Sequence, residues 1–162
     1  MKVKYLFLLL FAFGLITACS FNQTVKSSGE ASLQGSWSED SVANKAQLVN
    51  YEQNYFTFTC DSFYLQINSY SKVNLQGGAC YDAKAWKEYA KGYYTLNKDT
   101  LKFDGVFVDE KFKYKPEKSC YRFGKFTQNF LIIQQSDSIL NLKSLQTGLN
   151  HQLVLKQKRL CK

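Results

Sequence analysis

Histidine, methionine and proline occur only once each in this chain of 162 residues. A serine or cysteine nucleophile needs a nearby base, usually a histidine, and only His151 is available. It lies in the polar stretch Gly148-Leu149-Asn150-His151, beside the start of an expected strand, where we expect a solvated side chain. The sequence therefore predicts no nucleophilic catalysis.

Two further kinds of reactive site are missing. The only paired glycines before a cysteine, Gly77 and Gly78, are followed by Ala79, with no lysine or hydroxyl in register for a phosphate loop. Paired carboxylates serve as acid and base in some enzymes, but the candidates lie at turns or at outward strand positions, and no spacing singles out a pair. They are Asp61, Asp82, Glu88, Asp104, Asp109 and Glu110. We expect no catalytic residue, no cofactor and no enzyme activity.

The first residues form a targeting segment. Lys2 and Lys4 precede an apolar stretch from Tyr5 to Ile16, which is too short to span a bilayer. The following Leu15-Ile16-Thr17-Ala18-Cys19 resembles the bacterial lipobox. This resemblance implies a signal peptide over residues 1–18 and a lipid on Cys19; an ordinary secretory signal with a chance cysteine is the alternative. Two acyl chains would hold the protein stably at a membrane.

The residues after Cys19 bear on location. The polar stretch up to residue 32 has no apolar period, so residues 19–32 are expected to form a flexible tether. Ser20 stands where an aspartate would favour retention at the inner membrane, and no acidic run follows to favour export to the surface. We therefore expect a lipid-anchored protein of the cell envelope, at the outer membrane and facing the periplasm.

Four more cysteines follow, and no two are two to four residues apart, as zinc ligands usually are. We expect no metal. In an oxidising compartment an even number predicts two disulfides, with three pairings left open. The four are Cys60, Cys80, Cys120 and Cys161.

The net charge is +8, which becomes +6 without Lys2 and Lys4. A basic surface attracts anionic lipids or nucleic acid. Here the lysines are scattered along strands and turns, which is typical of a solvated surface, so we expect no nucleic-acid partner.

From residue 33 to 162 short aromatic and β-branched runs alternate with polar residues and are separated by turn residues. Phe56 and Phe58 share one face of a run, and Trp86, Ala90 and Tyr94 share a face of another. This pattern predicts one all-β domain, an antiparallel meander of 8–10 strands closing into a barrel. The runs Phe112 to Tyr114 and Tyr121 to Phe126 are included among them. One short helix is expected within Asp40 to Val49, capped by Asp40 or Ser41.

Gly35-Ser36-Trp37 opens this domain, and Lys158-Arg159 follows the last expected strand. The arrangement resembles the lipocalin (calycin) pattern, and in particular short lipocalin-like lipoproteins of Gram-negative bacteria. The resemblance implies that Trp37 and Arg159 form a barrel-closing pair, with the arginine packed across the ring. An unrelated β-sandwich is the alternative, because glycine before an aromatic residue starts many strands.

A fumarate hydratase is not supported. One class of that enzyme closes its site with a loop carrying Met-Pro, whereas Met1 and Pro116 are the only such residues here. The other class holds an iron–sulfur cluster on cysteines, which would compete with the disulfides.

The aromatic residues leave two binding functions open. If the barrel holds a cavity, its lining for a small apolar ligand would be drawn from Phe56, Phe58, Tyr64, Trp86, Tyr94, Phe103 and Phe123. If the barrel is filled, outward residues such as Tyr89 and Tyr93 would contact another envelope protein, and the domain would be structural.

Overall fold

The computed structural model describes residues 29–74, 77–82, 84–117 and 120–161. The expected signal peptide, Cys19 and the tether up to residue 28 lie outside these ranges. Among the described residues, no helix has the length and apolar character needed to cross a membrane.

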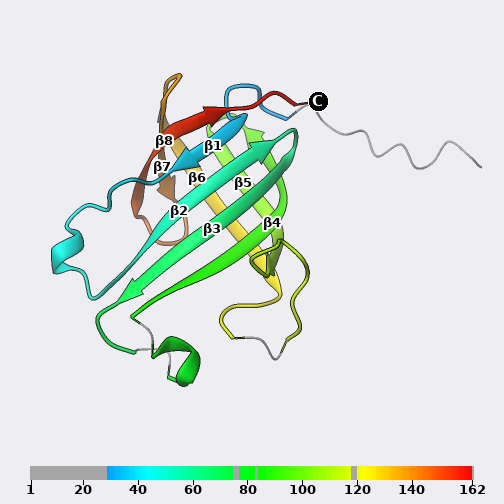
Figure 1. The fold of residues 1–162 in the computed structure, drawn as a ribbon. Coiled ribbons are helices and arrows are strands. Elements are labelled where there is room, and N and C mark those ends of the chain that lie inside the picture. The colour runs from blue at the N-terminus through cyan, green and yellow to red at the C-terminus, as the bar shows by residue number, and fades with distance from the viewer. Residues whose placement is uncertain (1–28, 75–76, 83, 118–119, 162) are drawn as a thin grey trace, which may run out of the picture.

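Eight antiparallel strands form a closed barrel, in which each strand pairs with the next and the last pairs with the first (Figure 1). The strands are β1 (Gly35–Ser38), β2 (Asn50–Thr59), β3 (Ser62–Ser71), β4 (Ala85–Asn97), β5 (Thr100–Val108), β6 (Lys125–Gln135), β7 (Ile139–Ser144) and β8 (Asn150–Lys158). The predicted meander and its closure are confirmed. This is the lipocalin-like, up-and-down arrangement, in which closure leaves no unpaired strand edge.

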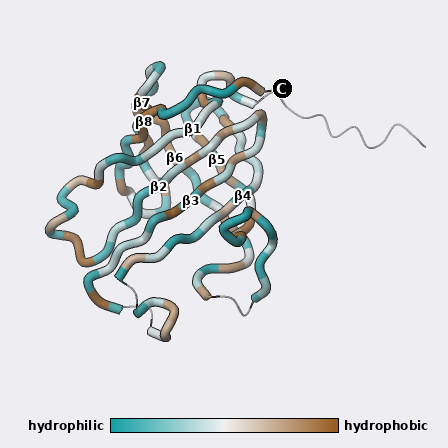
Figure 2. The backbone as a smooth tube through the Cα atoms, viewed as in Figure 1, coloured by the Kyte–Doolittle hydropathy of each residue, from teal (hydrophilic) through white to brown (hydrophobic). Residues whose placement is uncertain are grey.

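Alternation along the strands sets their inner and outer faces. Phe58 of β2 pairs with Phe63 of β3, and both are buried, while Thr57 between the buried Phe56 and Phe58 faces outward. Figure 2 shows hydrophilic and hydrophobic residues alternating along these strands. One face of each strand therefore builds the core, as the sequence pattern indicates.

The short helix expected within Asp40 to Val49 is found only as one turn, and its expected cap is wrong. This connection contains only a single 3-10 turn, η2 (Lys45–Gln47), and its N-cap residue Asn44 makes no capping hydrogen bond with its side chain. The Asp40 carboxylate instead accepts hydrogen bonds from Ser38 Oγ, at 2.7 Å, and from the Lys156 ammonium. It is thus engaged at the barrel wall and does not cap a helix.

Two expected strands are also wrong in extent. The backbone of Phe112 has φ 56° and that of Tyr121 has φ 69°, both in the left-handed region, where an extended strand cannot continue. Tyr114 makes only an isolated bridge to Val108, and β6 begins at Lys125. Residues 109–124 therefore form the connection between β5 and β6.

Aromatic rings fill the barrel. Phe103 lies at their centre, with its ring centroid 5.3 Å from that of Phe56, 4.9 Å from Phe63 and 5.7 Å from Phe130. The buried core cluster consists of Leu33, Trp37, Phe56, Phe58, Phe63, Leu65, Ile67, Ala90, Tyr94, Leu101, Phe103, Phe126, Phe130, Leu140, Leu142 and Leu153. Rings packed in this way occupy the space that a larger barrel leaves for a ligand.

One end of the barrel, here called the closed end, is sealed by residues 29–34. The Tyr94 hydroxyl accepts hydrogen bonds from the Glu30 amide (3.1 Å) and from Gln34 Nε2 (2.8 Å), and donates to the Cys60 carbonyl (2.7 Å). Trp37 is buried, and its Nε1 donates to the Leu33 carbonyl at 2.8 Å. The start of the described chain and its C-terminus both lie at this end (Figure 1).

The expected packing of Arg159 across Trp37 is not found. Arg159 is exposed beyond the end of β8, and the cation–π contacts among the described residues do not include it. Residues 29–34 cover Trp37 instead. Gly35 is required at the start of β1, because its φ is +143° and a Cβ there would lie 2.4 Å from the Gln157 carbonyl oxygen.

The prediction of two disulfides is confirmed, and the pairing is Cys60–Cys161 and Cys80–Cys120. The first joins the β2–β3 turn to the C-terminus at the closed end. The second joins the β3–β4 connection to the β5–β6 connection at the opposite end. Each bond therefore ties together segments that are distant in sequence.

Candidate functional site

The end opposite the closed end is here called the mouth. The connections spanning residues 39–49, 72–84, 109–124 and 145–149 meet there, and the Cys80–Cys120 disulfide links the second to the third. In barrels of this kind the mouth is where a ligand site is sought.

Three aromatic rings lie beside this disulfide. Tyr81 and Tyr121 directly follow the two bonded cysteines, and each contacts Trp86 of β4, with centroid distances of 5.2 Å and 6.1 Å. Tyr81 and Tyr121 also meet edge to face at 5.3 Å. Burial raises the pKa of Tyr81. The disulfide thus holds two tyrosines against the one tryptophan at the mouth.

A network of charged side chains adjoins Trp86. Arg122 donates from its backbone N–H and from Nε to Glu88 Oε1, both at 2.9 Å, and from Nη2 to Glu88 Oε2 at 2.8 Å. Trp86 Nε1 donates to Glu88 as well, at 3.1 Å. Burial acts to raise the pKa of Glu88, but the hydrogen bonds and charge of Arg122 outweigh it, so that pKa lies below its ordinary value.

The same arginine reaches Glu52 of β2. Its Nη2 lies 2.9 Å from Glu52 Oε1, which also accepts from Ser69 Oγ at 3.5 Å, while Oε2 has no partner among the described residues. Two carboxylates therefore share one guanidinium, and the network of Glu52, Glu88 and Arg122 carries a formal charge of −1. Glu52 is also the accessible member, with 41% of its side chain exposed against 3% for Glu88.

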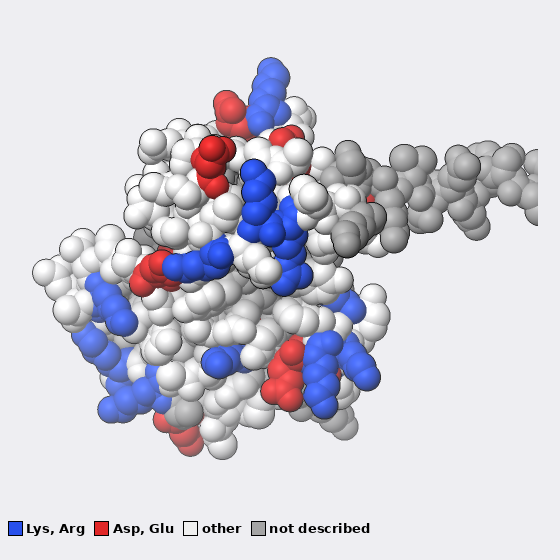
Figure 3. Space-filling model, turned by 45° about the horizontal axis from the view of Figure 1, so that its top comes forward, with Lys and Arg blue, Asp and Glu red and all other residues white. Residues whose placement is uncertain are grey.

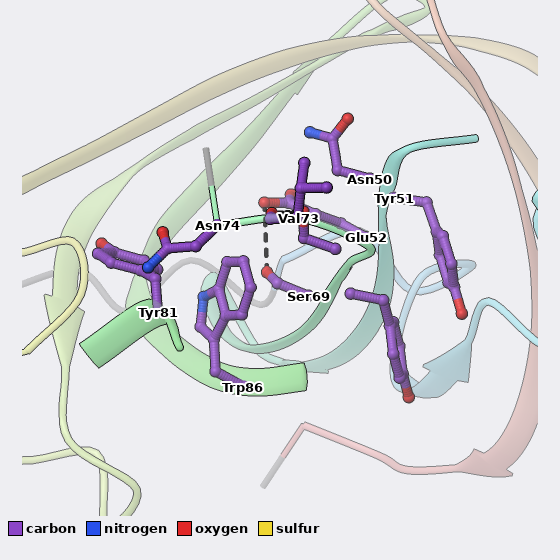
Figure 4. A pocket seen from close by; sticks show the side chains of 10 residues that line it. Asn50, Tyr51, Glu52, Ser69, Val73, Asn74, Tyr81 and Trp86 are labelled. Atoms are coloured by element: carbon purple, nitrogen blue, oxygen red, sulfur yellow. Dashed lines mark hydrogen bonds between the residues drawn. The ribbon is translucent and has the colours of Figure 1, made fainter. Parts of the chain in front are cut away.

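A pocket opens over Glu52, between the aromatic rings (Figure 4). It holds about 60 Å³, enough for a few waters or the tip of a larger molecule. Figure 4 shows Tyr81 and Trp86 on one side, Tyr51 on the other, and Glu52 with Ser69 between them. Its lining is Asn50, Tyr51, Glu52, Ser69, Tyr70, Ser71, Val73, Asn74, Tyr81 and Trp86. A carboxylate among aromatic faces suits a cation or a hydrogen-bond donor.

His151 belongs to a second polar group, where β1 ends and β8 begins. Its Nδ1 lies 3.0 Å from Glu39 Oε1, and Glu39 Oε2 accepts from the backbone N–H and from Nδ2 of Asn54, both at 3.0 Å. Glu39 and Asn54 are buried, so the expected solvated histidine is wrong. These contacts satisfy one another and hold the 39–49 connection to β2 and β8.

The seven expected ligand residues do not come together. Phe56, Phe58, Tyr94 and Phe103 are in the filled core, where they contact one another. The other three lie elsewhere: Tyr64 packs against Phe112 outside the barrel, Trp86 lies at the mouth, and Phe123 is 50% exposed. Only Trp86 lines the mouth pocket.

The sequence pattern does not single out Glu52 or Arg122, and it places Glu88 wrongly. Glu88 is expected at an outward or turn position, but it is buried on the inner face of β4. The alternation of Trp86 and Ala90 already contained this signal, since Glu88 lies between them on the same face. A carboxylate in that position is stable only because Arg122 neutralises it.

An open groove also lies on the outer face of β3, β4 and β5. It holds about 650 Å³ and is lined by Ser62, Phe63, Tyr64, Lys91, Gly92, Tyr93, Asp104, Gly105, Val106 and Tyr114. Tyr93 and Tyr114 are 65% and 78% exposed. Lys91 Nζ lies 5.0 Å from the Tyr114 ring and donates to the Phe112 carbonyl at 2.6 Å, which fixes one wall of the groove.

The described residues contain no cluster of three or more histidine, cysteine, aspartate or glutamate side chains placed to hold a metal ion. The buried carboxylates named above are held by neighbouring side chains, Glu88 by Arg122 and Glu39 by Asn54 and His151.

Comparisons with known proteins assign no function to this chain. No family model matches the chain, and no curated protein does. A solved structure described as a lipocalin-like protein from Bacteroides uniformis ATCC 8492 is similar, with 17% sequence identity and a TM-score of 0.39, over 76% of this chain and 98% of that one. The lipocalin-like fold is assigned here on the closure and order of the chain's own strands.

Proposed function

We propose that this protein is a non-enzymatic binding module of the bacterial envelope, held at a membrane by a lipid on Cys19 and binding its ligand at the mouth of the barrel. The observation that carries the binding part is the mouth pocket, where the accessible carboxylate of Glu52 faces aromatic rings. Eight-stranded barrels of lipocalin type commonly hold one small ligand. Here the rings of the core occupy the interior, which favours the mouth over a deep apolar site.

The pocket favours a ligand that inserts an ammonium or guanidinium group. Oε2 of Glu52 offers an acceptor, and the faces of Tyr81 and Trp86 add cation–π attraction, of about 0.5 to 2 kcal/mol. The volume of about 60 Å³ admits only such a tip, so the rest of the ligand would lie outside. A basic side chain of a partner or a small amine fits this description.

Binding is tested by titrating the purified lipoprotein with Nα-acetyl-lysine amide and with its uncharged analogue Nα-acetyl-norleucine amide, following the Trp86 indole N–H by NMR. The lysine compound alone should shift this signal, and Glu52→Gln should abolish the shift. Asp104→Asn is the matched control, because that carboxylate is exposed on the outer face and should not affect the response. An equal response of the Glu52→Gln variant would refute the mouth as the site.

Anchoring is tested separately. Mass spectrometry of the protein from bacterial membranes should show a diacylated cysteine at position 19 as the first residue. A Cys19→Ala variant should keep residues 1–18. An intact, unmodified Cys19 in membrane-extracted protein would contradict the proposed anchor and leave the binding site untouched.

A second candidate function is docking of an envelope protein on the outer groove. The exposure of Tyr93 and Tyr114 favours it, because tyrosine supplies contact area and a hydrogen bond at low entropic cost. A photocrosslinker at position 93 should then capture one discrete partner in cells, whereas a crosslinker at the exposed Thr95, on the same strand face, should not. Equal labelling from both positions would count against this surface.

A further inference from the structure

Besides the mouth pocket and the outer groove, a cleft lies outside the barrel, where residues 45–49 face the start of β2 and the end of β3. It holds about 330 Å³, at the lower end of the range for small-molecule sites. Leu48 and Val49 supply apolar surface, and the stacked rings of Tyr51 and Tyr70, 4.8 Å apart, are also part of its lining. Three lysines, Lys45, Lys72 and Lys84, line it as well.

Contacts with other residues that line the cleft fix the positions of two of these lysines. Lys45 Nζ lies 5.2 Å from the Tyr51 ring centroid and 5.8 Å from that of Tyr70. Lys72 Nζ donates to the Ala46 carbonyl at 2.8 Å, and the Lys72 amide donates to the Val49 carbonyl, also at 2.8 Å. Both ammonium groups are therefore positioned by neighbouring parts of the lining.

The third lysine is fixed through its backbone. The Lys84 carbonyl accepts from the Ser71 amide at 2.9 Å, which places the start of the segment leading into β4 beside the end of β3. The three lysines thus come from the β1–β2 connection and from both ends of the β3–β4 connection. Figure 3 shows lysine and arginine side chains grouped on the side of the molecule where η2 lies in Figure 1.

No carboxylate balances these charges in the lining of the cleft. The ion pairs among the described residues use Arg122, Lys125, His151 and Lys156, and none uses Lys45, Lys72 or Lys84. The nearest acid in sequence, Asp82, accepts a hydrogen bond from Asn74. Three positive charges around an apolar floor favour an occupant with a negative charge on an apolar body.

We propose that this cleft binds a free organic anion: a carboxylate, sulfonate or phosphate among the three ammonium groups, with an aromatic or short aliphatic body against Leu48, Val49 and the tyrosine pair. A volume of about 330 Å³ suits one such molecule, whereas a membrane surface would offer a flat array of headgroups. The proposal does not depend on the site proposed at the mouth. The two sites have opposite charge preferences and are separated by the Tyr51–Tyr70 stack.

The test is calorimetric titration of the purified lipoprotein with 4-ethylbenzoate, with the neutral 4-ethylbenzamide and the cationic 4-ethylbenzylammonium as comparisons. The anion should bind at least about tenfold more tightly than either analogue, and its affinity should fall as salt increases. Equal affinity for the amide would overturn the proposal, because binding would then be apolar only.

Two triple variants separate this cleft from general surface charge. Lys45→Gln/Lys72→Gln/Lys84→Gln should lose at least about tenfold in affinity for 4-ethylbenzoate. Lys102→Gln/Lys113→Gln/Lys143→Gln removes the same charge from exposed positions elsewhere and should retain the affinity. Equal losses in the two variants would refute the site. Folding is checked by the thermal midpoint, and a single Leu48→Asp variant, which places a repelling charge in the cleft, gives an independent loss of binding.

Discussion

Arg122, in the connection before β6, makes three hydrogen bonds to the buried carboxylate of Glu88 in β4. These residues are 34 positions apart, and their pairing fixes the β5–β6 connection at the mouth. The contact lets a charge lie inside a barrel whose other inner positions are largely apolar. Removing this contact therefore tests how the β5–β6 connection is fixed at the mouth.

Arg122→Met should destabilise the protein by about 2 to 4 kcal/mol, somewhat less than for a fully buried pair because Arg122 is 40% exposed. The cost comes from leaving Glu88 buried without its cation. Arg122→Met/Glu88→Leu should recover most of it, since no charge is then stranded. Urea unfolding measures the free energy of unfolding of both variants. Lys125→Ala is the control: it breaks the exposed contact to Asp104 and should cost under about 1 kcal/mol. Similar losses for Arg122→Met and Lys125→Ala would contradict this account.

The same pair predicts a dependence of stability on pH. The pKa of Glu88 is below its ordinary value in the folded protein, because Arg122 outweighs the effect of burial. Its contribution is therefore present above the unfolded carboxyl pKa, about 4.3, and is lost as pH falls through the lower folded pKa. In Arg122→Met, burial should outweigh the two hydrogen bonds that Glu88 keeps, from the backbone N–H of residue 122 and from Trp86 Nε1, and should raise the pKa of Glu88. The stability of this variant relative to Glu88→Gln/Arg122→Met should then increase as pH falls. Unfolding midpoints from pH 7 to pH 3 would show the two opposite slopes, and parallel curves would refute them.

The fold was predictable because its determinants are local. Alternation along runs such as Phe56 to Cys60 gives strands and faces, and closure follows because each strand pairs with its sequence neighbour. The use of all four downstream cysteines in disulfides followed from their even number and spacing. Their pairing did not, because it depends on which connections meet at each end of the barrel.

The candidate site was less predictable because it depends on contacts between distant segments. Alternation put Glu88 on the inner face, but its stabilising partner lies in an irregular connection whose path has no sequence signal. Likewise, family resemblance suggested that Arg159 covers Trp37, whereas this chain uses residues 29–34 for that purpose. The sequence left a cavity and a filled barrel open, and four of the seven candidate ligand residues belong to the filled core: Phe56, Phe58, Tyr94 and Phe103.

Tyr94→Phe should open the closed end. Its hydroxyl accepts from the Glu30 amide and Gln34 and donates to the Cys60 carbonyl. Removing it leaves the part-buried Glu30 amide without this partner, while Gln34 Nε2 still donates to the Cys60 carbonyl, and should cost about 1 to 3 kcal/mol. Amide hydrogen exchange should accelerate at Glu30. Tyr93→Phe, at the neighbouring exposed position, is the control and should leave exchange unchanged. Unchanged exchange in Tyr94→Phe would show that this hydroxyl does not hold residues 29–34.

The two disulfides should differ in what they stabilise. Cys60–Cys161 spans 101 residues and Cys80–Cys120 spans 40, so chain entropy predicts losses of about 5 and about 4 kcal/mol when each is replaced by serines. Only Cys80→Ser/Cys120→Ser should also release Tyr81 and Tyr121 from Trp86, which the indole N–H shift of Trp86 would report. A larger shift of this signal in Cys60→Ser/Cys161→Ser would contradict the assignment.

The last prediction concerns the filled core. Phe103 contacts four other phenylalanine rings and is 2% exposed, so Phe103→Ala should cost about 3 to 5 kcal/mol and leave a cavity enclosed by apolar side chains. Such a cavity stays dry and binds small apolar molecules. Benzene should therefore raise the thermal midpoint of Phe103→Ala and leave that of the parent protein unchanged. Phe123→Ala is the matched control, because that ring is half exposed and its loss creates no enclosed space. Stabilisation of the parent protein by benzene would show that its core already holds a void, and would return the ligand site to the interior of the barrel.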